Sequence, residues 1–385
     1  MNSDLSRRSA LKALLVASAA TGSAGSASAG AAGDWAAVGA LASKAVADRV
    51  VPGVAICVRR GGKTIFEAAY GAANIETGAR MRPDTICRVG SVTKQFTAAA
   101  ILLLAQEGKL NLDDPMSRFL PDFPRGKDIT LDRMLTHTSG LADYIQAGSR
   151  AEVFRFFRTD LSNAEMLDYL RHLPKLMIFE PGTSWTYSST GYVLLGIIIE
   201  QLTGQRVEEV FRERLFGPAG MTNTAVDHAA DVVPGRASGY TFNGKAASGF
   251  DNAAYVSMSV PATAGNMRST ARDLCAWHEA LLAGRILSAP SLKAMLTPAR
   301  LNDGSFPKEG HLGPALQPIR YGYGQSLVDL TGRPCVLHGG NIPGFLTDLR
   351  TYRDTGLTQA VIINIDGNPR SGKLMDDLPL AVSRA

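Results

Sequence analysis

The sequence predicts an α+β fold, in which an antiparallel sheet built from both ends of the chain is flanked by helices and interrupted by a long helical segment. Each end of the chain carries two short runs of β-branched and aromatic residues joined by a tight turn, which is the pattern of a β-hairpin. Between the two ends, helical periods alternate with loops rich in proline and glycine. Tight hairpins indicate antiparallel pairing.

The terminal elements are predicted from three stretches. Residues 34–53 have apolar side chains at helical spacing and end at Pro52-Gly53, a stop signal. "GVAICVRR" and "KTIFEAAYG" then flank Gly61-Gly62 and predict the first hairpin. Near the other end, residues 345–367, "FLTDLRTYRDTGLTQAVIINIDG", repeat this design around Arg-Asp-Thr-Gly.

The middle of the chain is predicted to be mostly helical. Its helical periods are "TAAAILLLAQEGKL", "AEMLDYLRHL", "GYVLLGIIIEQLTG", "RVEEVFRERLF" and "ARDLCAWHEALLAG". We therefore expect one domain, residues 30–385, with a sheet subdomain from about 34–90 and 318–385 and a helical subdomain from about 91–317.

Residues 1–29 have the pattern of an export signal. Paired arginines, Arg7-Arg8, precede a short apolar stretch, and Ala27-Ser28-Ala29 supplies the small residues of a cleavage site. The stretch is shorter than the roughly 20 apolar residues of a membrane span, and the arginine pair favours the twin-arginine route to a periplasmic or secreted location. The alternative is a disordered basic tail.

Charge and cysteine content narrow the function classes. The net charge of +5 is too small and too dispersed to indicate nucleic-acid binding. Cys57, Cys87, Cys275 and Cys335 lie in apolar surroundings without a Cys-x-x-Cys pair or a histidine cluster. They are interpreted as buried free thiols, with a disulfide as the alternative in an exported protein. No metal or organic cofactor is expected, and the oligomeric state is left open.

Ser91 and Lys94 form a Ser-x-x-Lys pair at the start of a helical run. In one interpretation Ser91 is the N-cap of this helix, a position that serine favours. In the other, Lys94 lies on the same helical face as Ser91, and a buried neutral lysine could activate the serine as a nucleophile. Two other pairs carry less weight. Ser9–Lys12 lies in the export signal, and Ser305–Lys308 has Pro307 inside it and glycines beside it.

Two further stretches could complete such a site. Tyr187 lies in the loop of "EPGTSWTYSSTGYVLLG", where it is either a packing residue or a phenol facing a cleft. In "CVLHGGNIPGF" a short apolar strand is predicted to run into His338-Gly339-Gly340 and then a turn. The glycines permit the close backbone approach that an oxyanion hole needs, and the alternative is a simple glycine turn.

Together these segments resemble the serine β-lactamase-like family, which includes class C β-lactamases, D,D-carboxypeptidases, family VIII-type esterases and D-aminopeptidases. Ser-x-x-Lys belongs to a set of partner motifs in serine β-lactamases and penicillin-binding proteins. Further likenesses are "LTHTSGL" at 135–141, "AGNMRSTARDL" at 264–274, "YGYG" at 321–324 and "HGGNIPGF" at 338–345. The resemblance covers roughly residues 35–367 and implies the β-lactamase/transpeptidase-like fold.

The resemblance implies a role for each motif residue. Ser91 matches the acylated nucleophile, Lys94 its proton-transfer partner and Tyr187 the tyrosine that acts as general base and acid. The oxyanion donors would be the backbone N–H groups of Ser91 and Asn341. The substrate-binding positions would be Ser189, His338, Gly339 and Gly340. His137 is interpreted as structural.

Two departures from the family pattern bear on specificity. His338 stands where a permanently charged lysine is usual, and a histidine is mostly neutral at pH 7. Ser189 stands where the family usually has asparagine and lacks its carboxamide. Both changes argue against an efficient β-lactamase.

The resulting expectation is an exported serine hydrolase that cleaves ester or amide bonds of a small molecule or peptide through an acyl-enzyme. A D,D-carboxypeptidase or weak β-lactamase is the first alternative. A catalytically silent protein that binds cell-wall peptides is the second. An α/β-hydrolase is excluded because the sequence has no Gly-x-Ser-x-Gly elbow.

Overall fold

The computed structural model describes residues 35–147, 149–307, 320–330 and 332–385. The predicted export signal, with Ser9–Lys12, lies outside the described residues, and so does Lys308.

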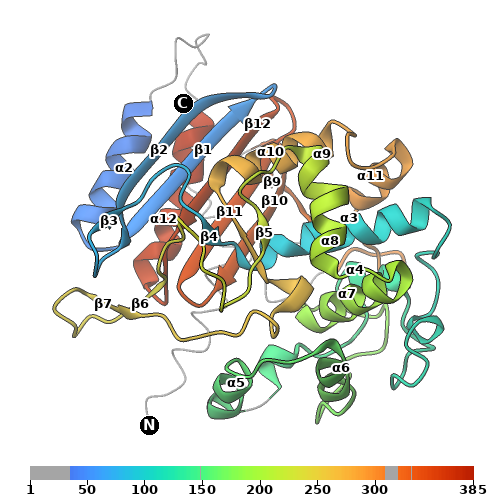
Figure 1. The fold of residues 1–385 in the computed structure, drawn as a ribbon. Coiled ribbons are helices and arrows are strands. Elements are labelled where there is room, and N and C mark those ends of the chain that lie inside the picture. Colours follow the sequence, from blue (N-terminus) through green and yellow to red (C-terminus); the bar gives the residue numbers. More distant parts are fainter. Residues whose placement is uncertain (1–34, 148, 308–319, 331) are drawn as a thin grey trace.

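A seven-stranded antiparallel sheet, built from both ends of the chain, confirms the predicted α+β class (Figure 1). Its strand order is β3-β2-β1-β12-β11-β10-β9. The strands are β1 (Gly53–Arg60), β2 (Lys63–Asn74), β3 (Ala79–Arg80), β9 (Ser326–Leu330), β10 (Arg333–Ile342), β11 (Phe345–Tyr352) and β12 (Leu357–Ile363). The two chain ends meet where β1 pairs with β12.

Both predicted hairpins are confirmed. Arg60 pairs with Lys63 across Gly61-Gly62, and both glycines have positive φ, 58° and 81°, as a type I′ turn requires. In the second hairpin, Tyr352 of β11 pairs with Leu357 of β12. These turns fix the register of the strands they join.

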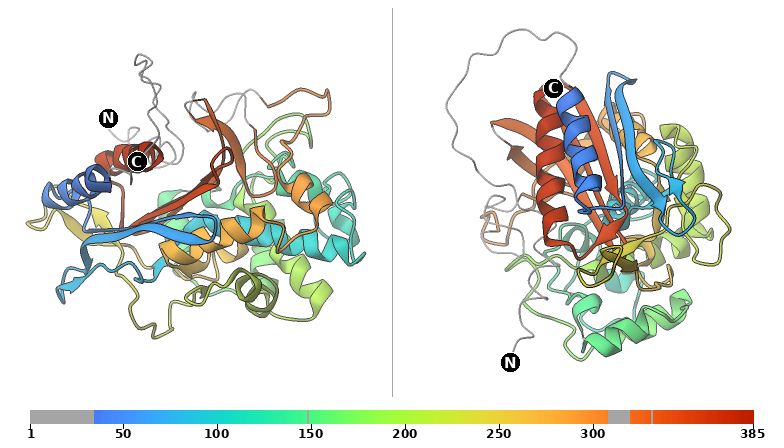
Figure 2. Two further views of the ribbon diagram at one scale, coloured as in Figure 1. Left: turned by 90° about the horizontal axis from the view of Figure 1, so that it is seen from above. Right: turned by 90° about the vertical axis from the view of Figure 1, so that its left-hand side faces the viewer.

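Helices cover both faces of the sheet (Figure 2). On one face α2 (Trp35–Ala47) and α12 (Pro369–Arg384) lie side by side and close an apolar layer with the strands. On the other face α10 (Ala271–Leu282) packs across β1, β11 and β12. The sequence predictions missed α12, whose pattern is interrupted by Gly372 and by Pro379, a residue unfavourable inside a helix.

Helices form most of the regular secondary structure between the two halves of the sheet, as predicted. The longest helices there are α3 (Thr93–Gln106) and α7 (Ser189–Thr203), both largely buried. The others are α4 (Leu131–Leu135), α5 (Arg150–Phe156), α6 (Asn163–Arg171), α8 (Val207–Phe211), α9 (Gly217–Ala219) and α11 (Ala289–Met295). The 3₁₀-helix η1 (Gly90–Val92) leads directly into α3.

Two small three-stranded sheets outside the main sheet were not predicted. They are β4 (Cys87–Arg88) with β8 (Met267–Ser269) and β5 (Ala225–Val226), and β13 (Ile365–Asp366) with β6 (Tyr240–Phe242) and β7 (Phe250–Asn252). Strands of two or three residues are too short to show alternation, so the sequence could not reveal them.

The interpretation of the cysteines as buried free thiols is confirmed, since all four are buried and unlinked. None of the helices in the described part of the chain is long and apolar enough to cross a membrane. Within the same residues, no group of three or more His, Cys, Asp and Glu side chains is arranged to hold a metal ion.

Candidate active site

Ser91 lies inside η1, one turn before Lys94 on α3. The cap positions of these two helices are Val89 and Val92, and neither helix start has a side-chain cap bond. Ser91 is therefore not an N-cap. Its hydroxyl oxygen instead lies 3.3 Å from Nζ of Lys94.

Lys94 is fully buried, with an exposed fraction of 0%. Its Nζ donates to the carbonyl oxygen of Ala264 over 2.8 Å and lies 3.5 Å from Oγ of Ser189. No ion pair of Lys94 is formed within the described residues. Burial therefore lowers the pKa of Lys94 to about 7, and the charge of Asp143 opposes this shift.

Two threonines fix α3 against the segment that carries Ala264. Thr93 Oγ1 donates to the carbonyl of Gly90 over 2.7 Å and accepts from the N–H of Met267. One turn later, Thr97 Oγ1 donates to the carbonyl of Thr263 over 2.7 Å. Both bonds are buried, so the amine of Lys94 is held beside Ser91 by backbone contacts on both sides.

Tyr187 is positioned by the loop that contains His137. The N–H of Thr186 donates to the His137 carbonyl over 3.1 Å, and the N–H of Ser188 donates to His137 Nδ1 over 3.2 Å. The two bonds bracket Tyr187, whose ring centroid lies 4.4 Å from that of His137. Because Nδ1 accepts, Nε2 carries the ring proton. Burial lowers the pKa of His137 well below 6.5, so the ring is neutral.

The Tyr187 ring lies beside the lysine, with its centroid 4.7 Å from Nζ of Lys94. Its hydroxyl is buried and has no hydrogen-bond partner among the described residues. Burial raises the pKa of Tyr187 well above 10. The nearby Ser91 hydroxyl opposes this shift, although the two hydroxyl groups do not have the geometry of a hydrogen bond. Tyr187 is therefore a neutral phenol at pH 7.

β10 carries His338 into the same cluster. His338 Nδ1 lies 2.6 Å from the carbonyl oxygen of Gly339, which can only accept, so Nδ1 bears the proton. Nε2 then accepts from the Tyr321 hydroxyl over 2.9 Å. Burial, followed by the charge of Lys94, lowers the pKa of His338 to about 3. Both ring nitrogens are thus engaged in a neutral imidazole.

The strand predicted to run into His338-Gly339-Gly340 is confirmed, and the predicted turn follows at Pro343-Gly344, after β10 ends at Ile342. Pairing with β11 extends to Ile342↔Phe345 and holds the glycines in the strand. Within the described residues, pairing of β10 with β9 ends at Leu337↔Ser326. The His338-Gly339-Gly340 motif thus lies on the part of β10 that extends beyond its pairing with β9.

Glycines allow η1 and β10 to approach closely. A β-carbon at Gly90, where φ is 50°, would lie 2.9 Å from the backbone nitrogen of Asn341. A β-carbon at Gly340 would overlap the carbonyl oxygen of Val89. The peptide that carries the Ser91 N–H therefore lies against the peptide that carries the Asn341 N–H, which suits a shared oxyanion site.

The structure brings most of the predicted site residues together. The Lys94 amine is surrounded by the predicted side chains of Ser91, Tyr187 and Ser189. His338 lies next to this group, with its ring centroid 6.2 Å from that of Tyr187. Sequence reasoning missed Asp143, Tyr321 and the Ala264 carbonyl. Asp143 and Tyr321 stand in or beside the quoted motifs "LTHTSGL" and "YGYG", which was the available signal. A backbone carbonyl has no sequence signature.

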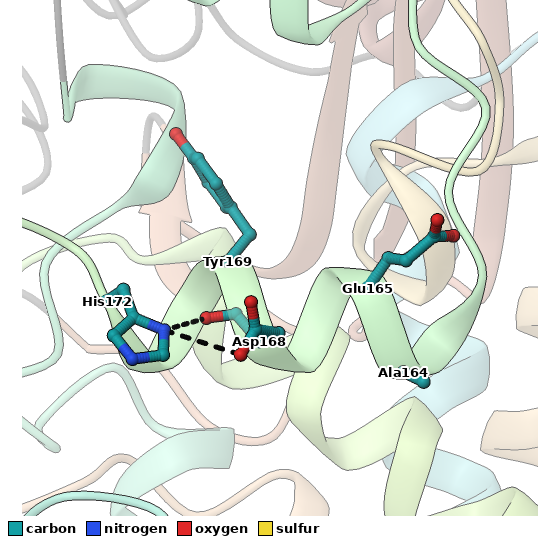
Figure 3. A pocket seen from close by; sticks show the side chains of 5 residues that line it. All are labelled: Ala164, Glu165, Asp168, Tyr169 and His172. Atoms are coloured by element: carbon teal, nitrogen blue, oxygen red, sulfur yellow. Dashed lines mark hydrogen bonds and ion pairs between the residues drawn. The ribbon is translucent and has the colours of Figure 1, made fainter.

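A separate shallow hollow lies on α6 (Figure 3). It is lined by Ala164, Glu165, Asp168, Tyr169 and His172. His172 Nδ1 bonds the carbonyl of Asp168 over 2.8 Å, and both of these side chains are 73% exposed. Since none of the residues around Lys94 lines it, this hollow is not part of the candidate site.

Comparison with known proteins identifies the class of protein. The family model described as Beta-lactamase matches residues 38–383. Penicillin-binding protein 4* of Bacillus subtilis is 28% identical over 323 residues, which is 80% of this chain and 67% of that protein. Esterase EstB of Burkholderia gladioli is 35% identical over 192 residues, which is 47% of this chain and 49% of that protein.

Solved structures agree in fold. The D-amino acid amidase of Ochrobactrum anthropi SV3 has a TM-score of 0.75 at 27% identity and covers 91% of this chain and 99% of its own. A D-stereospecific amidohydrolase from Streptomyces sp. has a TM-score of 0.74 at 29% identity, with 89% and 98% covered. The class is that of serine hydrolases acting on ester or amide bonds. The chain belongs to the β-lactamase family, whose model spans nearly all of its described residues.

Proposed function

We propose that this protein hydrolyses a small neutral ester or amide through an acyl-enzyme on Ser91. The observation that carries the proposal is the 3.3 Å contact between the Ser91 hydroxyl and the fully buried amine of Lys94. A neutral amine has two N–H donors and one lone pair. Ala264 and Ser189 offer acceptors for the donors, which leaves the lone pair for the Ser91 hydroxyl hydrogen.

In the proposed reaction, Ser91 Oγ attacks the substrate carbonyl carbon while Lys94 takes the hydroxyl proton. The N–H groups of Ser91 and Asn341 stabilise the oxyanion. The neutral Tyr187 phenol passes a proton to the leaving alcohol or amine and regains one from Lys94, which completes acylation. Water then adds to the acyl carbon, and its proton returns through the same groups as Ser91 Oγ leaves.

The preference for a neutral substrate rests on His338. Its two nitrogens are committed to Gly339 and Tyr321, and its pKa is lowered to about 3, so it provides no cation for a substrate carboxylate. D-amino acid amides are included among the candidate substrates because a D-amino acid amidase shares this fold. A D,D-peptidase or weak β-lactamase is the second candidate, supported by the similarity to penicillin-binding protein 4*.

A fluorophosphonate probe tests the nucleophile. The expected result is a single adduct on the Ser91 peptide by mass spectrometry, with Ser91→Ala as the unlabelled control. An adduct on Ser139 or Ser188, or an active protein without an adduct, would contradict the assignment. p-Nitrophenyl esters, D-amino acid anilides, D-Ala-D-Ala peptides and a chromogenic cephalosporin then rank the substrate classes.

Export through the twin-arginine route is part of the proposal and rests on Arg7-Arg8, the apolar stretch after them and Ala27-Ser28-Ala29. Fractionation of a bacterial host should find a mature chain that begins near Gly30 outside the cytoplasm. Replacing both arginines with lysine should retain the uncleaved chain in the cytoplasm, whereas export of that variant would contradict this route.

A further inference from the structure

Asp143 is a buried carboxylate that none of the predicted roles uses. It is 9% exposed and precedes the 3₁₀-helix η3 (Tyr144–Gln146). Its Oδ1 accepts from the N–H of Ile145 over 3.3 Å. A buried carboxylate needs either a counter-charge or several donors to offset its loss of hydration.

The loop around Asp143 is fastened to the first turn of α7. Thr190 Oγ1 donates to the Ala142 carbonyl over 2.6 Å and accepts from the N–H of Tyr144 over 3.1 Å. Ser188 Oγ also donates to the Ala142 carbonyl over 3.4 Å. The residues on both sides of Asp143 are thus tied to the helix start, so the carboxylate has a fixed place there.

That place lies next to Ser189, the residue that contacts Lys94. Ser188, the N-cap of α7, makes no side-chain cap bond. Burial raises the pKa of Asp143 to about 6, and the charge of Lys94 and the nearby N–H groups of Ile145 and Ser189 oppose this shift. The Ser189 hydroxyl lies 3.5 Å from Lys94 Nζ. Asp143 thus lies beside the residue that contacts the amine, since both of its neighbours are tied to the start of α7, and the positive end of α7 favours the charged carboxylate.

The other groups around Lys94 are uncharged. Tyr187 and Tyr192 present neutral rings, with centroids 4.7 Å and 5.6 Å from Nζ. His137 and His338 are neutral because burial and the charge of Lys94 both lower their pKa values. Among the described residues, Asp143 is the group whose charge raises the pKa of Lys94, against the larger lowering by burial.

We propose that Asp143 is a positioning residue of the reaction, the buried counter-charge of Lys94, which acts through Ser189 to set the pH at which the lysine can take the Ser91 proton. The inference rests on the proposed function. It differs from a purely structural role because a structural residue would change the amount of active enzyme without changing that pH.

The sign of the effect follows from the charges. Burial lowers the pKa of Lys94 and the negative charge of Asp143 raises it, with a net value of about 7. Acylation of Ser91 should therefore slow as the pH falls through about 7, because the amine becomes protonated. Asp143→Asn removes the opposing charge, so the midpoint should move to lower pH by about one unit or more, as expected for loss of a nearby opposite charge.

The experiment measures the rate of Ser91 labelling by a fluorophosphonate across this pH range, using intact-protein mass spectrometry. Asp143→Ser is a second neutral variant that can still accept from Ile145, and it decides the question if Asp143→Asn does not fold. Asp143→Glu keeps the charge and should retain the midpoint. Tyr144→Phe is the matched control, since it deletes a buried bond to the Val260 carbonyl in the same element without changing charge.

Neutral variants that label more slowly at every pH with an unmoved midpoint would overturn the inference, and so would an upward shift. If the unmodified protein is not labelled on Ser91, the proposed function fails and the role of Asp143 fails with it. If that protein is labelled and the midpoints coincide, only the role of Asp143 fails.

Discussion

The Tyr321 hydroxyl donates to Nε2 of His338 over 2.9 Å, and this bond fixes the chemical character of the third motif. Because Nδ1 is also engaged, the imidazole can neither bind a proton readily nor turn a charged N–H toward a substrate. A cationic side chain at position 338 would instead offer a positive charge to a substrate.

The specificity prediction concerns His338→Lys combined with Ser189→Asn. The lysine adds a cation where a substrate carboxylate could lie, and the asparagine adds an amide able to donate to the substrate and accept from Lys94. A charge-assisted hydrogen bond contributes roughly 1.5–3 kcal/mol, and each 1.4 kcal/mol is about tenfold in rate. Acylation by a chromogenic cephalosporin should rise about ten- to a hundredfold, while a small neutral ester gains less.

Time-resolved mass spectrometry of the Ser91 acyl-enzyme measures this change. Tyr321→Phe is the control, because it removes the donor to His338 without adding a cation and should not favour the cephalosporin. An equal gain with the ester would show that these two positions do not set the preference.

Lys94→Ala and Tyr187→Phe should each lower turnover about 100- to 10,000-fold, the usual contribution of a group that transfers protons. The Lys94 amine lies 3.3 Å from the Ser91 hydroxyl and 4.7 Å from the Tyr187 ring centroid, so we expect the two residues to act on one proton path. The double variant should be little slower than the slower single variant. Multiplicative losses in steady-state kinetics, with folding checked by circular dichroism, would indicate separate roles.

Gly340→Ala should inactivate the enzyme without unfolding it. The added β-carbon would overlap the Val89 carbonyl and push β10 away from η1, which separates the N–H groups of Ser91 and Asn341. Loss of one oxyanion donor typically lowers kcat by about 100- to 1,000-fold. Gly244→Ala is a suitable control, since its β-carbon meets only the Phe242 ring in an exposed turn. Retained activity in Gly340→Ala would argue against this oxyanion site.

Asp227→Asn should destabilise the fold more than it affects chemistry. The Asp227 side chain is fully buried and pairs with Arg88, Arg236 and Arg268 over 2.8, 3.1 and 2.9 Å. Removing one partner of a buried ion pair costs about 3–5 kcal/mol because charge is left uncompensated. Urea unfolding measures the change, and Lys44→Ala, in an exposed pair with Asp48, should have little effect. Equal effects of the two substitutions would refute the special role of Asp227.

The sequence by itself determined the features that depend on local patterns. Gly61-Gly62 between two β-branched runs predicted a hairpin that the structure contains, and helical periods predicted α3 and α7. The spacing of Ser91 and Lys94 likewise predicted that they share one helical face. Each of these predictions depends on residues a few positions apart, so neighbouring side chains and backbone geometry suffice.

Only the tertiary structure decided what surrounds those residues. Asp143, Tyr321 and the Ala264 carbonyl are distant in sequence from Lys94 and His338, and packing of separate segments brings them together. The short strands β4, β5 and β8 exist because distant segments pair, not because of any pattern within them. The sequence alone therefore indicates which groups are available for chemistry. The ionisation of Lys94 and His338 depends on burial and nearby charge, which arise only when the chain is folded.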